Sequence, residues 1–577
     1  MPGGPENSAQ RQRAINLPFG LVNVVGVSPS LDLVSPRTTT VYKDPGLAAS
    51  CQPSKQASNA IIYLTYAAFL AMGLGFAWKY RKQSKAQFLS SNRTQRAIPL
   101  ALNFIASGLG SGILFTYPDI GAFAGVQGVL VYALASATPL LLFAVLTPLI
   151  RRRTPDGFLL TEWTRDRFGA PAALYLSVLT MVTMFLYMVA ELSAINSVIN
   201  LLTGLNGLPA LIVEVAVTTI YTSLGGFRVS FVTDNVQGTV VLLLIAICSI
   251  SIGTKAHIDP ALIGSSGLTR ATPLGWKLLY ILPVAVGTNV MFLSPFWLRA
   301  FAARTDRDLY LGAALATGWV FTILTVVGFT GIIAVWAHGE DKWGPVSEWS
   351  SVAFFYLIGE LPGWVVGFVV LMVVALSTAV FDSLQSAMVS TASNDLCRNK
   401  LGLRWIRAAV VVLIAPVVVV AVKAHASVLQ IFLISDIVSA AAIPCLLLAG
   451  LVEGLWFVGG WDVICGGCGG IIAVFVFGVV YYGSARGGGE LVYMKTLYAD
   501  DWGVFGAYVA APVGGILAMF AGCAVRIAGL WAVSKARGVP FQLERKEAAV
   551  VEEEVHVRDP VVAGPDRKQP AVYGTCG

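Results

Sequence analysis

The decamer NFIASGLGSG at residues 103–112 lies inside an apolar run that extends over about residues 97–118. Three of its last five residues are glycines, and each glycine weakens a helix by about 1 kcal/mol relative to alanine. A break at membrane depth is tolerated only inside protein or beside a water-filled cavity. The carbonyls that a break frees, together with a half-helix end, suit a small cation. The stretch therefore predicts a broken membrane helix beside an ion site, with close packing of small residues as the alternative.

The rest of the chain repeats this apolar character in blocks of membrane-spanning length. It has 577 residues, 56% of them hydrophobic and 12% charged, whereas soluble domains carry about 25% charged residues. We therefore predict an all-α polytopic membrane protein with about 13 transmembrane helices, each of about 20 residues. The predicted spans are about 58–79, 97–118, 126–150, 170–203, 207–222, 229–253, 274–298, 309–336, 363–393, 405–422, 428–452, 464–482 and 503–532.

The basic residues indicate how the chain is oriented. The net charge of +7 does not indicate nucleic-acid binding, because the basic residues lie in short loops between apolar blocks. With the N-terminus outside, the basic clusters near residues 79–96, 151–167, 299–307 and 398–407 all face the cytoplasm, as the positive-inside rule requires. We expect an integral protein of the plasma membrane, surrounded by lipid, with its C-terminus in the cytoplasm. The remaining predicted segments are an extracellular tail (1–57), a first helix with a cytoplasmic loop (58–96), an extracellular loop (254–273), two C-terminal helices (453–532) and a cytoplasmic tail (533–577).

Motifs for enzymes and bound cofactors are not found in the sequence. The four histidines form no cluster, and the CxxC of Cys465 and Cys468 has no second pair at zinc-site spacing. There is no P-loop, which argues against an ATP-driven pump. We expect a protein that is not an enzyme and that has no cofactor apart from a coupling ion.

Five carboxyl groups lie within predicted spans, where a charge is costly and commonly functional. They are Glu191, Glu214, Asp234, Asp382 and Asp436. No basic residue inside a span stands near them in sequence as an obvious partner. The alternative is that each forms a hydrogen bond with a neighbouring helix.

Two further motifs accompany these acids. Ser377 and Thr378 lie in the span 363–393, and Thr378 shares a helix face with Asp382, four positions later. YTSLGGF at 221–227 predicts a tight turn between two helices, and TDNVQ follows at 233–237. Asp234 then lies about 9 Å into its span.

Taken in order, these motifs resemble the sodium:solute symporter family, which includes sodium/proline, sodium/glucose and urea active transporters. The stretch 221–237 is similar to that family's signature between its fourth and fifth core helices. FWLRAFAAR at 296–304 resembles its cytoplasmic segment after the sixth. The resemblance covers about residues 58–532 and implies a LeuT-type fold. Two inverted five-helix repeats, about 97–253 and 274–452, would be preceded by one extra helix and followed by two.

The resemblance also implies an ion site between core helices 1 and 8, where the family holds sodium. By position, Ser107, Gly110 and Val374 would supply carbonyls, and Ser377 and Thr378 would supply hydroxyls.

The carboxylate of Asp234 would correspond to the family's acid on the ion path to the cytoplasm. Our topology places Asp382 on the same side of the ion site, so we expect both acids to form a release route. One departure concerns the coupling ion: Leu109 stands where some relatives carry an acid. Proton coupling is then an alternative to sodium coupling, with Glu191 as the candidate proton carrier.

The substrate is expected beside the ion, between core helices 1, 3, 6 and 8, in an apolar pocket with a few polar groups. We predict a secondary active symporter that takes up a small polar solute by alternating access. Urea or a related nitrogen compound is the first candidate substrate, and an amino acid such as proline is the second. A passive facilitator and a non-transporting nutrient sensor are the alternatives. The candidate lining residues are Asn103, Tyr117, Tyr187, Glu191, Tyr280, Asn289 and Phe292.

Overall fold

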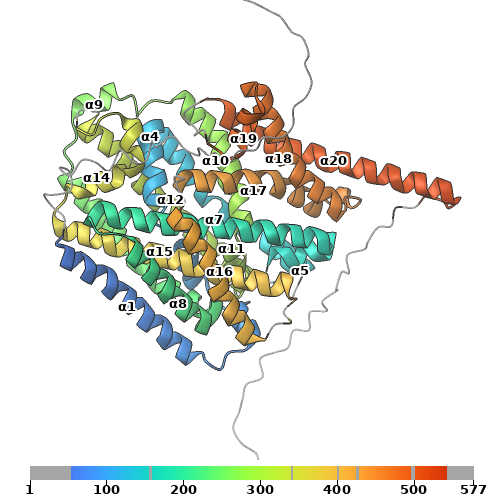
Figure 1. The fold of residues 1–577 in the computed structure, drawn as a ribbon, viewed down its shortest axis with the longest axis horizontal. Coiled ribbons are helices and arrows are strands. Elements are labelled where there is room, and N and C mark those ends of the chain that lie inside the picture. The colour runs from blue at the N-terminus through green and yellow to red at the C-terminus, as the bar shows by residue number, and fades with distance from the viewer. Residues whose placement is uncertain are drawn as a thin grey trace, which may run out of the picture. The chain divides into compact units, whose positions relative to one another are not determined.

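The computed structural model describes residues 53–154, 157, 159–339, 342–398, 400, 402–423, 428–495, 501–541 and 543. Within these residues every regular element is helical, and the one β-type contact is an isolated bridge between Gln95 and Ala303 (Figure 1). The all-α prediction is therefore confirmed for the described part. Most of the two predicted tails, 1–57 and 533–577, lies outside the described residues.

The helices follow one another through the whole described chain. Short turns of other helix types lie at Ser350–Val352, Ala392–Leu396 and Glu453–Leu455. The α-helices are α1 (Lys55–Lys79), α2 (Lys85–Leu89), α3 (Ala97–Gly108), α4 (Ile113–Ala137), α5 (Pro139–Arg153), α6 (Leu160–Phe168), α7 (Ala170–Thr203), α8 (Leu208–Lys255), α9 (Pro260–Ser265), α10 (Pro273–Phe292), α11 (Ser294–Ala302), α12 (Asp306–His338), α13 (Val346–Trp349), α14 (Ala353–Gly359), α15 (Gly363–Thr391), α16 (Leu403–Lys423), α17 (Val428–Leu451), α18 (Gly460–Tyr482), α19 (Ala485–Val492) and α20 (Gly503–Arg537).

Two long helical segments each contain a sharp turn at a glycine. Eleven segments of the described chain are long and apolar enough to cross a membrane, and two of these have 41 and 48 residues, about twice what one crossing needs. Gly125 (φ 61°) interrupts the first and Gly226 (φ 64°) the second. A Cβ there would collide with the backbone carbonyls of Leu268 and Phe88, so glycine is required. The expected total of about 13 crossings stays a prediction.

Two other helices are broken near their middle. α3 ends at Gly108 and α4 begins at Ile113, so residues 109–112 form the break that the glycines predict. α10 ends at Phe292 and α11 begins at Ser294, inside the span that the sequence suggested as continuous. Pro295 in the first turn of α11 suits a helix start and lacks the N–H that a continuous helix needs. Each broken helix begins one predicted five-helix repeat, where transporters commonly build their sites.

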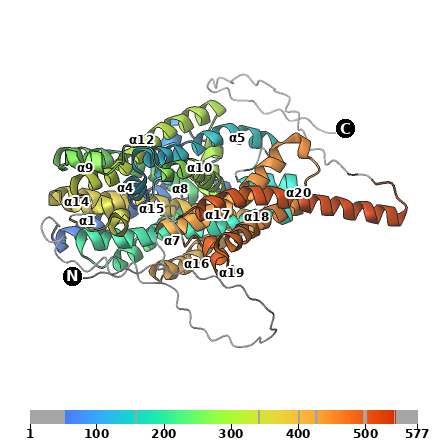
Figure 2. The same cartoon turned by 90° about the horizontal axis from the view of Figure 1, so that it is seen from above.

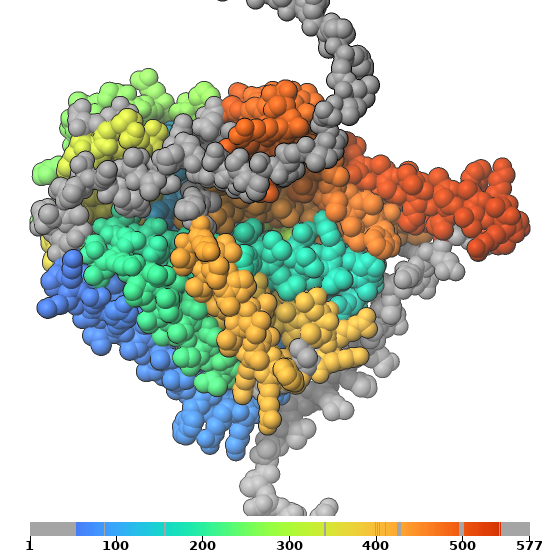
Figure 3. Space-filling model, viewed as in Figure 1, coloured from blue at the N-terminus to red at the C-terminus, as the bar shows by residue number. Residues whose placement is uncertain are grey.

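Helices distant in sequence pack against one another around these breaks. α12 packs on α3 and α4, α15 on α7 and α8, and α10 on α17. α1 lies along α8 and α15, and its neighbour α8 is visible beside it in Figure 3. α18 and α20 run together and pack on α17 (Figures 1 and 2). The broken helices are thereby enclosed by protein, as membrane depth requires.

The loops with the basic clusters meet at one end of this helix assembly. Gln95 pairs with Ala303, the guanidinium of Arg151 donates to the carbonyl of Ala300 at 3.0 Å, and that of Arg165 donates to the carbonyl of Asp395 at 3.1 Å. The clusters are therefore on the same side, as the predicted topology needs. Which side of the membrane this is stays a prediction.

Candidate functional site

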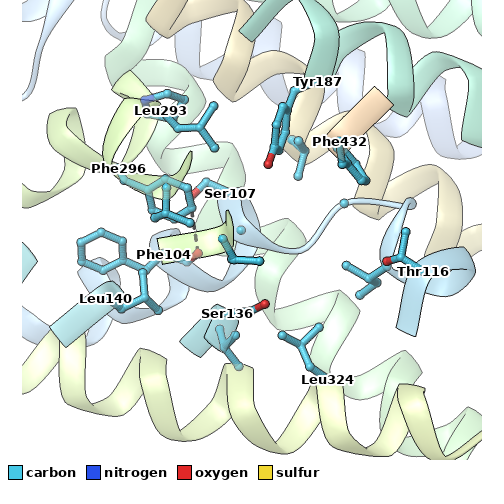
Figure 4. A pocket seen from close by; sticks show the side chains of 18 of the residues that line it. Phe104, Ser107, Thr116, Ser136, Leu140, Tyr187, Leu293, Phe296, Leu324 and Phe432 are labelled. Atoms are coloured by element: carbon cyan, nitrogen blue, oxygen red, sulfur yellow. Dashed lines mark hydrogen bonds between the residues drawn. The ribbon is translucent and has the colours of Figure 1, made fainter. Parts of the chain in front are cut away.

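A cavity of about 120 Å³ lies beside the break between α3 and α4. Its walls come from α3, α4, α5, α7, α10, α11, α12, α15 and α17. Figure 4 shows Tyr187 and Phe432 on one side of the backbone at the break, and Ser136 and Leu324 on the other. The lining residues that carry polar groups, or whose backbone lies at the break, are Ser107, Gly108, Gly110, Thr116, Tyr117, Tyr132, Ser136, Tyr187, Glu191 and Asp436.

Glu191 on α7 reaches the break itself. Its Oε2 accepts hydrogen bonds from the backbone N–H of Ser111 at 2.8 Å and from the hydroxyl of Ser111 at 2.7 Å. These donors lie at the N-terminus of α4, where the helix dipole favours an anion. Gly110 leaves room for this carboxylate, because a Cβ at residue 110 would overlap it unless the Glu191 side chain moved. A carboxyl group from a neighbouring helix therefore lies at the break, close to Leu109.

Asp436 on α17 brings a second carboxylate to the cavity. Its Oδ1 accepts a hydrogen bond from the side-chain amide of Asn289, which also donates to Ser435 at 3.1 Å. Its Oδ2 has no hydrogen-bond partner among the described residues. Asn289, a predicted lining residue, is not among the residues that line the cavity; it contacts Asp436, which does line it.

Aromatic rings cover much of the cavity wall. Tyr117 and Tyr132 stack with ring centroids 4.0 Å apart, and the hydroxyl of Tyr117 pairs with that of Ser136 at 2.6 Å. Tyr187 packs on Phe432 with centroids 4.8 Å apart. Two of the predicted lining tyrosines are therefore at the cavity.

Three other predicted lining residues lie away from it. The amide of Asn103 donates to the backbone carbonyl of Phe231 at 2.8 Å. Tyr280 donates to the carbonyl of Tyr508 at 3.3 Å and so faces α20. Phe292 is buried and, like these two, is not among the residues that line the cavity.

The predicted ion ligands fall into two groups. Ser107 and Gly110 line the cavity, with the Ser107 hydroxyl bonded to the carbonyl of Asn103 at 2.8 Å. Thr378 donates to the carbonyl of Val374 at 2.6 Å. Ion binding at these residues stays a prediction.

Ser377 instead donates to a carboxylate. Its hydroxyl lies 2.6 Å from Oε1 of Glu214 on α8, whose Oε2 accepts from the hydroxyl of Tyr66 on α1 at 3.2 Å. The sequence offered no signal for Tyr66, because α1 lies outside the predicted ten-helix core. Glu214 could be recognised only as an acid inside a span.

The two predicted release-route acids meet in one buried network. Asp234 forms an ion pair with Arg299 at 2.5 Å, and both side chains are fully buried. The hydroxyl of Ser383 lies 3.1 Å from Asp234 and 3.4 Å from Asp382. Asp382 also accepts from the hydroxyls of Tyr221, Ser230 and Thr233.

The position of Arg299 corrects the sequence interpretation, which placed this residue in a basic cytoplasmic segment. The interrupted helix continues through α11, so Arg299 lies inside the protein and pairs with an acid that seemed to lack a basic partner. Among the described residues, no group of three or more His, Cys, Asp or Glu side chains could hold a metal ion.

Comparisons with known proteins agree with this architecture. The solved structures that are similar in fold include those of two transporters. A sodium-coupled sialic acid symporter in a substrate-bound outward-open state has a TM-score of 0.65 at 14% identity and covers 81% of this chain and 97% of its own. MHP1, a nucleobase-cation-symport-1 family transporter in a closed conformation, has a TM-score of 0.51 at 14% identity and covers 79% and 97%. The LeuT-type fold is thereby confirmed.

The relatives that are similar in sequence include a spermidine transporter and a urea-proton symporter. The spermidine transporter DUR31 of Candida albicans is 52% identical over 508 residues, which is 88% of this chain and 96% of that protein. The urea-proton symporter DUR3 of Oryza sativa subsp. japonica is 23% identical over 54% of this chain and 43% of that protein. The relatives are transporters rather than enzymes. Residues 88–455 match the sodium:solute symporter family, and the chain belongs to that family.

Proposed function

We propose that the protein is an ion-coupled symporter that carries a small organic cation of the polyamine class. The proposal rests on the acidic side chains that line the cavity. Glu191 and Asp436 line it, and no Lys, Arg or His side chain does so among the described residues. A carboxylate removed from water is costly unless a positive group faces it. A bound organic cation supplies that group.

The position of Glu191 argues against an amino acid as substrate. In transporters with broken helices, the N-terminus of a half-helix binds the anionic group of the substrate. Here Glu191 already accepts two hydrogen bonds from Ser111 at that N-terminus. A substrate carboxylate would have to displace Glu191, and it would also face the like charge of Asp436. The proline-like alternative is therefore disfavoured.

The aromatic wall favours an amine over urea. Ammonium groups are attracted to the faces of tyrosine rings, and Tyr117, Tyr132 and Tyr187 line the cavity. The methylene segments of a slender polyamine can contact Phe104 and Phe296 in the same cavity. The 52% identity to a spermidine transporter over nearly its full length supports this choice. Urea is neutral and stays the second candidate, because relatives named as urea transporters are 23–26% identical.

Uptake by the purified protein in liposomes tests the proposal. Labelled spermidine, urea and proline are compared with an imposed sodium gradient, a proton gradient or neither. We expect spermidine to accumulate under at least one gradient, with unlabelled polyamines competing better than urea or proline. Flux that ignores both gradients would indicate a passive facilitator, and binding without flux would indicate a sensor. Accumulation of urea with no competition by spermidine would refute the polyamine assignment.

Asp436→Asn isolates the contribution of the cavity charge. A hydrogen bond to a charged group contributes about 1.5–3 kcal/mol, so the apparent affinity for spermidine should fall about 10–100-fold. Uptake of urea, if present, should change far less. Asp119→Asn is the matched control, because Asp119 is a buried acid on α4 that does not line the cavity. Equal losses in the two variants would show that the effect is not specific to Asp436.

A further inference from the structure

We propose that the end of the helix assembly where α1, α2, α8 and α16 meet binds the headgroup of an anionic phospholipid. Six basic side chains in this region form what we call the basic surface. They are Lys79, Arg81, Lys82, Arg228, Arg404 and Arg407. None of them belongs to the predicted ion site or lines the substrate cavity. The inference therefore goes beyond the proposed function and does not depend on it.

Contacts between segments that are distant in sequence bring the basic surface together. The guanidinium carbon of Arg228 on α8 lies 4.3 Å from the ring centroid of Tyr80, directly after α1. That of Arg407 on α16 lies 5.9 Å from the ring centroid of Phe88 on α2, and Arg407 donates to the carbonyl of Leu224 on α8 at 3.4 Å. Figure 3 shows α1 beside α8 and α8 beside α16 on one face of the molecule. The six cations thus gather in one region although they come from three stretches of sequence.

The protein does not neutralise the charge of the basic surface. The three stretches that contribute to it, 78–96, 222–233 and 398–410, contain no Asp or Glu. Within the part of the chain that the structure describes, none of the six cations forms an ion pair. Three of the guanidinium groups lie near aromatic rings, which attract a cation but leave its charge in place. Because like charges repel, a bound anion would stabilise this arrangement.

Other arginines near this end of the protein bind acceptors within the chain. Arg151 and Arg165 donate to backbone carbonyls at 3.0 and 3.1 Å, and Arg299 forms a buried ion pair with Asp234. The positive-inside rule accounts for basic residues at this end in general. It does not require that one group of them lack acidic partners. This difference indicates that the basic surface binds an anion from outside the chain.

Exposed tryptophans place the basic surface at the level of the lipid headgroups. Trp78 lies in the last turn of α1 and Trp405 in the first turn of α16, and each is 70% exposed. Tryptophan is enriched where hydrocarbon meets the headgroups. The predicted topology puts this end at the cytoplasmic leaflet, which contains anionic lipids. Guanidinium groups bind phosphate through paired hydrogen bonds. An anionic phospholipid matches both the arginines and the tryptophans, whereas a soluble anion would match the arginines alone.

Binding of labelled lipid to the full-length protein in micelles of a neutral detergent tests the proposal. Phosphatidylserine and phosphatidylcholine are compared, each with a fluorescent label on one acyl chain. We expect phosphatidylserine to bind at least about tenfold more tightly, because each basic residue near an anionic lipid raises the affinity about fivefold. The combined variant Arg81→Gln, Arg228→Gln and Arg407→Gln should therefore bind phosphatidylserine about 100-fold more weakly. Its affinity for phosphatidylcholine should not change.

Two control variants separate the charge of the basic surface from the net charge and from the fold. The first combines Lys255→Gln, Arg270→Gln and Lys423→Gln. It removes the same charge at the other end of the protein, because Lys255 and Lys423 are the last residues of α8 and α16. Its affinity for phosphatidylserine should stay within about twofold, because distant exposed charges are screened by salt. The second control replaces the three arginines of the basic surface by lysine and should keep most of the affinity, because the charge remains.

Four results would contradict the inference. The first is equal affinity for the two lipids, and the second is equal weakening in the two glutamine variants, which would follow from net charge alone. The third is a lysine variant that binds as weakly as the glutamine variant, which would indicate a loss of structure. The fourth is soluble glycerophosphoserine competing as well as the lipid, which would assign the site to a free phosphate ester. Because every readout is lipid binding, these results leave the proposed symport function untouched, and a failure of transport leaves the lipid site untouched.

Discussion

The ion pair between Asp234 and Arg299 leads to a prediction about stability that can be worked out from its contacts. Both side chains are fully buried and 2.5 Å apart, and Ser383 connects them to Asp382. The network therefore has two carboxyl groups and one guanidinium group. Three variants separate their contributions: Asp234→Asn, Arg299→Gln and the two changes combined.

The magnitudes follow from the charges that each variant leaves behind. Removing one partner of a buried pair costs about 3–5 kcal/mol. Asp234→Asn should lie near the lower value, because Asp382 remains across Ser383 to offset the Arg299 charge. Arg299→Gln should lie near the upper value, because it leaves two carboxyl groups bridged by one hydroxyl. The combined variant should be more stable than the sum of the single changes predicts, by about 2–3 kcal/mol.

Denaturant titration of the protein in detergent micelles measures these differences. The pair between Arg526 and Asp462 is the matched control, because Asp462 is buried but 29% of the Arg526 side chain is exposed. Its coupling should be smaller, about 1 kcal/mol. Additive single effects at Asp234 and Arg299, or an Arg299→Gln protein as stable as Asp234→Asn, would refute the reasoning. If Asp234→Asn loses transport, the loss must be interpreted together with the measured stability of that variant. Loss of an ion release route is not the only explanation when the variant is also less stable.

Two substitutions at glycines, each with a control substitution at another glycine, extend the test to the backbone. Gly226→Ala places a side chain at a positive φ against a backbone carbonyl and should destabilise the protein by about 1–3 kcal/mol in the same titration, whereas Gly264→Ala, in open space, should have little effect. Gly110→Ala should displace the carboxylate of Glu191 and weaken spermidine binding about tenfold or more, and a protein that binds normally would show that Glu191 is not fixed at the break. Gly108→Ala adds a methyl group at an ordinary contact distance and should leave the stability unchanged.

The broken helix and the helical class could be predicted because their causes are local. Three glycines in five residues weaken one turn of helix whatever surrounds them, and apolar blocks of about 20 residues favour membrane spans. The interruption at Leu293 has a weaker local cause, a single proline two residues later. A single proline is tolerated in many membrane helices, so the sequence alone did not separate α10 from α11.

The partners of the buried acids could not be predicted, because they come from distant positions. Ser377 is 163 residues from Glu214, and Arg299 is 65 residues from Asp234. Helical spacing shows which residues share a face of one helix, but not which face of another helix lies opposite. Tyr66 lies on a helix outside the ten-helix core that the family resemblance implies. A single tyrosine hydroxyl also produces no sequence periodicity from which its partner could be predicted.

The buried carboxyl groups fall into two classes, according to whether a basic side chain offsets their negative charge. Asp234 forms an ion pair with Arg299, which suits a structural contact between α8 and α11. Glu191, Glu214 and Asp436 have hydroxyl, amide or backbone partners and no basic side chain among the described residues. A membrane protein that encloses such groups needs positive charge from outside. Two of them line the cavity, and the third contacts α15, one of the helices that form its wall, so an organic cation and a coupling ion can supply that charge together. Each bound cation lowers the cost of enclosing the negative charge of the carboxyl groups. Binding of either cation should therefore favour the occluded state, which also holds the other cation. This is the condition for coupled transport.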